Sequence, residues 1–233
     1  MSSELKYRIG WLIIFSIAMG FLEAAVVIYL RELYYPNGFS FPLTAMDERL
    51  GIVELLREAA TVVMLAGVGV LTGRSWNQRF AFFLTSFAIW DIFYYVFLKV
   101  FLDWPASFLT WDILFLIPVP WYGPVLAPII ISITMMALAV VLVYKDFHNT
   151  SSRLSIIDWT LLVLGSLVVI ASWTVSFLSY CSATSTDMAS AMTSFVPQVY
   201  NWNLFFIGVG ILLVAIFLFW KRSNDPPPHK TVT

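Results

Sequence analysis

Apolar residues gather into long runs separated by short polar segments. An α-helix rises about 1.5 Å per residue, so about 20 mostly apolar residues are needed to cross the hydrocarbon core of a membrane. Five runs meet this length and a sixth, near the C-terminus, is slightly short but uninterrupted. The pattern predicts an all-α membrane protein, a bundle of six transmembrane helices. The expected spans are Gly10–Leu30, Gly51–Leu71, Phe80–Leu102, Pro124–Tyr144, Trp159–Tyr180 and Trp202–Trp220.

A seventh apolar stretch, Phe108–Trp121, is too short for a typical span and ends in two prolines. Stretches of this length more often re-enter the membrane or lie at its interface, and proline disfavours a continuous helix. We therefore expect a re-entrant or interfacial segment between the third and fourth helices, forming a lid over the bundle. A plain surface loop packed on the bundle is the alternative.

The loop charges predict the orientation of the chain. Lys and Arg recur on one side of the expected spans, whereas the 103–123 and 181–201 loops contain neither and the 31–50 loop contains only Arg31 and Arg49. The positive-inside rule then places both termini in the cytoplasm of a multi-pass protein of the plasma or inner membrane. We expect one transmembrane domain over residues 1–223 and a disordered cytoplasmic tail over 224–233.

Composition agrees with a membrane class and excludes others. Apolar residues make up 60% of the chain and charged residues 12%, about half the charged share of a soluble domain. The formal net charge is −1 and the basic residues are scattered, so lipid is the expected partner and nucleic acid is not. Cys181 is the only cysteine, which rules out an intrachain disulfide, and no histidine falls in an apolar run. No metal site is expected, and no cofactor is indicated.

Ionisable residues inside spans are costly, and here they fall only in the first three spans. Counted at 1.5 Å per residue, Glu23 and Glu58 lie about 10 Å from the outer ends of their spans and Asp91 near the bilayer middle. Asp112 approaches from the same outer side. We therefore expect one outward-opening polar cavity. The candidate ligand- or proton-binding residues are Glu23, Glu54, Arg57, Glu58, Asp91, Tyr95, Lys99 and Asp112.

Structural roles compete with function at several of these positions. Glu54 lies in the first turn of its helix, where the helix dipole stabilises an acid. Lys99 can extend to the headgroups, and Asp112 can cap a short helix. Arg57 and Glu58 can form a structural ion pair. Glu23 and Asp91 lie deeper, where a buried hydrogen bond between helices is the structural alternative.

Three functions remain open, and no catalytic residue can be assigned. The chain contains no histidine motif, paired DxxxD or GxSxG arrangement. The first hypothesis is a membrane enzyme or binding protein for a lipid-like or small cationic ligand, with Arg57 and Lys99 orienting an anionic head. The second is a small transporter, or its substrate-binding subunit, that uses the carboxylates for proton or cation coupling. The third is an accessory subunit with other membrane-protein subunits as partners.

The loop at 181–201 carries one further expectation. A short amphipathic helix beginning at Asp187 is expected to rest on the membrane surface.

Overall fold

The computed structural model describes residues 3–148 and 153–222. Its helices are α1 (Ser3–Tyr34), α2 (Glu48–Thr72), α3 (Trp76–Leu102), α4 (Leu126–Phe147), α5 (Ile156–Thr184), α6 (Met188–Met192) and α7 (Trp202–Arg222), with strands β1 (Trp111–Phe115) and β2 (Trp121–Pro124). All the helices except α6 are long and apolar enough to cross a membrane. This confirms a polytopic helical membrane protein in contact with lipid. The tail predicted over 224–233 lies outside the described residues.

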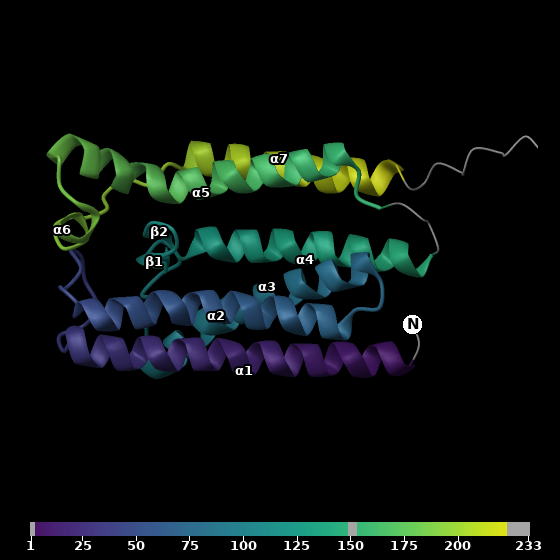
Figure 1. Cartoon of the computed structure of the whole chain (residues 1–233), viewed down its shortest axis with the longest axis horizontal. Helices are drawn as coiled ribbons and strands as arrows, with labels where there is room; N and C mark the ends of the chain where they lie inside the picture. The colour runs from purple at the N-terminus through teal and green to yellow at the C-terminus, as the bar shows by residue number, and fades with distance from the viewer. Residues whose placement is uncertain (1–2, 149–152, 223–233) are drawn as a thin grey trace, which may run out of the picture.

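The long helices run side by side along one axis, as Figure 1 shows. The beginning of α1 and the end of α7 lie at the same end of the bundle, which we call the terminal end. The hairpin formed by β1 and β2, the 35–47 segment and α6 lie toward the opposite end, which we call the loop end. The two ends of the described chain lie together because the six long helices pass along the bundle an even number of times.

Helix α3 is the centre of the first half of the chain, where it packs against α1, α2 and α4. Helix α5 packs instead along α7. Gly165 of α5 and Gly208 of α7 allow this close approach, since a Cβ on Gly208 would lie 2.9 Å from the backbone nitrogen of Val169. Small residues are the usual means by which membrane helices come together. The bundle therefore consists of a larger group, α1 to α4, and a pair, α5 with α7.

The segment between α3 and α4 forms an antiparallel hairpin, in which Asp112 pairs with Gly123. The apolar pattern of Phe108–Trp121 did not predict these strands, and the prolines that rule out a helix occupy the connection between them. In β2, the Trp121 ring stacks on Trp173 of α5 with centroids 5.4 Å apart. The hairpin therefore joins the two helix groups. That it re-enters the membrane stays a prediction.

Helix α6 begins where expected, with Asp187 accepting a hydrogen bond from the Ser190 backbone nitrogen at 3.0 Å. That it rests on the membrane surface stays a prediction. Ala191 is fully buried and packs with Tyr122, Phe177 and Phe195. The helix covers the hairpin because these rings provide an apolar surface within the protein.

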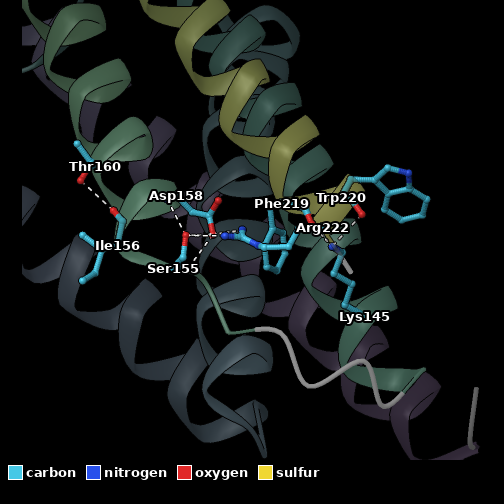
Figure 2. Close-up of polar contacts among 8 residues, drawn as sticks. All are labelled: Lys145, Ser155, Ile156, Asp158, Thr160, Phe219, Trp220 and Arg222. Carbon is cyan, nitrogen blue, oxygen red and sulfur yellow. Dashed lines mark hydrogen bonds and ion pairs between the residues drawn. The ribbon is translucent and has the colours of Figure 1, made fainter. Parts of the chain in front are cut away.

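Polar side chains fasten α4, α5 and α7 together at the terminal end (Figure 2). Lys145 of α4 is 1% exposed and donates to the carbonyl oxygens of Phe219 and, at 3.2 Å, Trp220 in the last turn of α7. Arg222 of α7 donates to Ser155 Oγ at 2.6 Å and forms an ion pair with Asp158 of α5. This network satisfies backbone carbonyls that a helix end leaves unpaired.

Candidate functional site

A cavity of about 550 Å³ lies at the loop end of the larger helix group. Its walls come from α1, α2 and α3, from β1 and the turn that follows it, and from the 34–48 segment and α6. On α1, the lining residues Glu23, Val27, Leu30 and Tyr34 recur at helical spacing and so share one face. The polar residues that the sequence placed in separate spans thus meet in one space, except for Lys99.

Arg57 lies between two carboxyl groups from different helices. Its Nε and Nη2 atoms donate to Glu54 Oε1 at 2.9 and 2.5 Å, and its Nη1 atom forms an ion pair with Glu23 Oε1. Thr61 Oγ1 donates to the other oxygen of Glu23 at 3.3 Å. Glu54 is one helical turn before Arg57, so the spacing of α2 aligns this pair. The cluster joins α1 to α2 and neutralises part of the acidic charge.

The carboxyl group of Glu58 accepts hydrogen bonds from the backbone next to the hairpin and is not paired with a basic side chain among the described residues. The Leu116 backbone N–H donates to both carboxyl oxygens of Glu58, at 3.1 and 2.9 Å. Leu116 directly follows β1, so this contact joins α2 to the hairpin. Within the described residues, Glu58 forms no ion pair, so the ion pair expected between Arg57 and Glu58 is not formed. Adjacent positions on a helix do not face each other, whereas Glu54 and Arg57 do.

Asp112 is paired with a basic residue that the sequence assigned to a loop. Arg31 Nη2 lies 3.2 Å from Asp112 Oδ1, and both side chains are buried. The Arg31 guanidinium also lies over the Trp104 and Phe39 rings, 3.8 and 4.4 Å from their centroids. Burial raises the pKa of the Asp112 carboxyl above its usual value, and the positive charge of Arg31 opposes that rise. Arg31 therefore contacts Asp112 and two aromatic faces, while its Nη1 atom is buried without a hydrogen-bond partner among the described residues.

Asp91 is buried on α3 and accepts a hydrogen bond from Ser132 Oγ of α4 at 2.7 Å. Tyr95, one turn further along α3, is 5% exposed and lines the same cavity. In the part of the chain that the structure describes, no Lys or Arg pairs with Asp91. Asp91 is thus a second carboxyl group of the cavity whose contact is a neutral donor.

Lys99 lies apart from this cluster. Its ammonium group is 2.7 Å from Asp103 Oδ1, its side chain is half exposed, and it does not line the cavity. The position shares α3 with Asp91 and Tyr95, but the side chain points to the end of the helix because the αL residue Asp103 terminates it there. The structure therefore gives Lys99 a local contact and no part in the cavity.

Sequence reasoning missed several polar contributors to the site, among them Arg31, Asp47, Glu48, Thr61 and Ser132. Asp47 and Glu48 line the cavity where α2 begins, in a segment that the sequence assigned to a loop. Arg31 lies on the cavity face of α1, and extending the helical periodicity beyond Leu30 would have found it. Thr61 and Ser132 are single hydroxyl groups within apolar runs. Such residues commonly bond to their own helix backbone, so their sequence carries no signal for a partner on another helix.

The charge balance of the cavity is strongly acidic. Seven lining residues are acidic and two are basic. The acidic residues are Glu23, Asp47, Glu48, Glu54, Glu58, Asp91 and Asp112, and the basic residues are Arg31 and Arg57. Over residues 3–148 and 153–222, no group of three or more His, Cys, Asp or Glu side chains has an arrangement suited to a metal ion. The excess negative charge can be balanced by protonation, by water or by an organic cation.

Comparisons with protein-family models, with curated proteins and with solved structures of known proteins give no match for this chain.

Proposed function

We propose that this membrane protein binds a small organic cation, or the cationic group of a lipid-like ligand, in the cavity at the loop end. The observation that carries the proposal is the disposition of the two cavity arginines. Arg57 is shared by Glu23 and Glu54, and Arg31 is paired with Asp112. Glu58 and Asp91 therefore remain without a basic partner among the described residues, and a ligand can supply the positive charge that balances them.

The walls around these carboxyl groups suit an organic cation better than a metal ion. Trp90, Tyr94 and Tyr95 line the cavity beside Asp91. Aromatic faces attract ammonium groups, most strongly where water is excluded. A buried carboxylate without a compensating charge is costly, and a cationic ligand supplies that charge in the same desolvated space. In this proposal, Glu58 and Asp91 bind the cation and the three aromatic residues enclose it.

The cavity opens to the outside of the cell in this proposal, because the loop charges place the terminal end in the cytoplasm. Transport of the bound cation and assembly into a larger complex would require features beyond binding, and no contact of the described residues favours either. We therefore propose ligand binding alone.

The test is calorimetric titration of the purified full-length chain with tetraethylammonium. We expect saturable binding that weakens by at least about tenfold, or about 1.4 kcal/mol, in Glu58→Gln and in Asp91→Asn. Matched controls are Glu32→Gln and Asp103→Asn, because these acids are exposed and do not line the cavity. The controls should bind as the unmodified chain does.

The absence of saturable binding, or equal affinity in the cavity variants and the controls, would overturn the proposal. Each variant is first compared with the unmodified chain by size-exclusion profile and thermal midpoint. Asn at position 91 can still accept the hydrogen bond from Ser132, so the contact between α3 and α4 is preserved.

A further inference from the structure

A second cavity, of about 250 Å³, adjoins the first between the two helix groups. Both cavities are lined by Trp90 and Asp91 of α3 and by Leu114 and Phe115 of β1. Asp91 therefore stands at the boundary between an acidic outer space and the second space, which we call the inner cavity.

The inner cavity is apolar apart from this boundary. It is lined by α3, α4, α5 and α7 and by the hairpin, with Trp121 and Trp173 as two of its aromatic walls. The polar side-chain groups besides Asp91 are the hydroxyl groups of Ser132 and Ser166 and the indole nitrogens. Ser132 already donates to Asp91. The indole nitrogens of Trp90, Trp121 and Trp173 are buried without a hydrogen-bond partner among the described residues. The inner cavity therefore offers mainly hydrocarbon contacts, together with these N–H donors.

The inner cavity reaches the outside of the bundle through α5. Ser166 lines it and is exposed, while its neighbour Val169 is buried. α5 crosses the membrane, so a residue exposed at the middle of this helix faces lipid. The exposed Ser166 thus marks the side from which a molecule dissolved in the bilayer would enter.

We propose that the ligand is a cationic amphiphile without a phosphate group, with its ammonium group at Asp91 and its hydrocarbon chain in the inner cavity. This inference rests on the proposed function and names its ligand class. The shared boundary at Asp91 gives one molecule access to both spaces. The first cavity is lined by seven acidic and two basic residues, so a phosphate beside the ammonium group would meet net negative charge.

The test uses decyltrimethylammonium with a photoreactive diazirine at the middle of its chain, added to the full-length protein in lipid nanodiscs. Illumination and peptide mass spectrometry then locate the label. We expect labelling of α4 between Ile131 and Met135 and of α5 between Ser166 and Ile170, and a several-fold loss of that labelling in Asp91→Asn. Label confined to lipid-facing positions outside the inner cavity would overturn the inference.

A pair of tryptophan substitutions separates this inference from the proposed function. Ser166→Trp fills the rim of the inner cavity, whereas Leu167→Trp adds the same ring at an exposed position that does not line it. We expect Ser166→Trp to lose inner-cavity labelling and retain tetraethylammonium affinity, and Leu167→Trp to retain both. Unchanged labelling in Ser166→Trp would overturn the inference while leaving tetraethylammonium binding intact. If the proposed function is wrong, the unmodified chain will show no saturable binding of tetraethylammonium.

A probe that carries a phosphate group tests whether the site excludes phosphate. A decylphosphocholine probe with the same diazirine should label the inner cavity weakly or not at all. Equal labelling by the two probes would overturn the exclusion of phosphate.

Discussion

Arg57 balances two carboxyl groups that come from different helices, and its side chain is only 20% exposed. The sequence offers Glu58 as the partner of Arg57, but residues three apart share a helix face and the structure pairs Arg57 with Glu54. The choice of Glu23 as the other partner was not predictable, since it depends on the rotation of α1 against α2. The same reason hid the partner of Arg31, because Asp112 lies 81 positions further along the chain.

Replacement of Arg57 by Gln should destabilise the protein by about 3 kcal/mol, because breaking a buried ion pair leaves its acids uncompensated. The expected measurement is a lower thermal midpoint in detergent. Adding Glu23→Gln and Glu54→Gln to the same chain should recover most of the loss, since neutral amides can hydrogen-bond to one another. If the triple variant melts no higher than Arg57→Gln, charge compensation is not the role of this arginine.

Each transmembrane helix was predictable because an apolar run of sufficient length has few other stable conformations in lipid. Helices α1, α2 and α5 extend beyond those runs at both ends, as α1 does to Ser3 and Tyr34. Polar residues continue a helix at no cost once it leaves the hydrocarbon core, so hydropathy alone underestimates helix length. The hairpin was missed for another reason. Its strands are short, and their pairing depends on the packing of Trp121 against α5.

The contact between Lys145 and the end of α7 could not be foreseen from charge either. The loop charges predict that Lys145 is one of several basic residues on the cytoplasmic side, but the structure buries it against the Phe219 ring, 4.0 Å from the centroid. A cation at a helix C-terminus also interacts favourably with the helix dipole.

Lys145→Met should therefore lower the free energy of unfolding by about 1–3 kcal/mol, the cost of leaving buried acceptors without a donor. Hydrogen exchange should rise in the last turn of α7 above all. Tetraethylammonium affinity should not change, because the loop end is at the other side of the bundle. Protection of the last turn of α7 equal to that of the unmodified chain would refute this assignment.

The whole molecule is divided into two helix groups joined mainly through the hairpin and a limited contact between α4 and α7. The acidic cavity belongs to the larger group, and the inner cavity lies where the two groups face each other. The bias of loop charge toward one side predicts which end meets the cytoplasm, but the arrangement of the helices is compatible with either orientation.

Cysteine labelling tests that orientation. In a Cys181→Ser background, Thr44→Cys places a thiol at the loop end and Ser3→Cys places one at the terminal end, both at exposed positions. A membrane-impermeant maleimide should label Thr44→Cys in intact cells and Ser3→Cys only after permeabilisation. The reverse pattern would turn the cavity toward the cytoplasm.

The two hydrogen bonds from Leu116 to Glu58 have a consequence for the rate and affinity of ligand capture. A flexible glutamate normally loses about 0.5–1.5 kcal/mol of rotational freedom when a ligand immobilises it. Here the protein incurs that loss during folding, while each carboxylate oxygen keeps a lone pair for another donor. Glu58 is therefore preorganised, so a cation that reaches it meets an acceptor already in place.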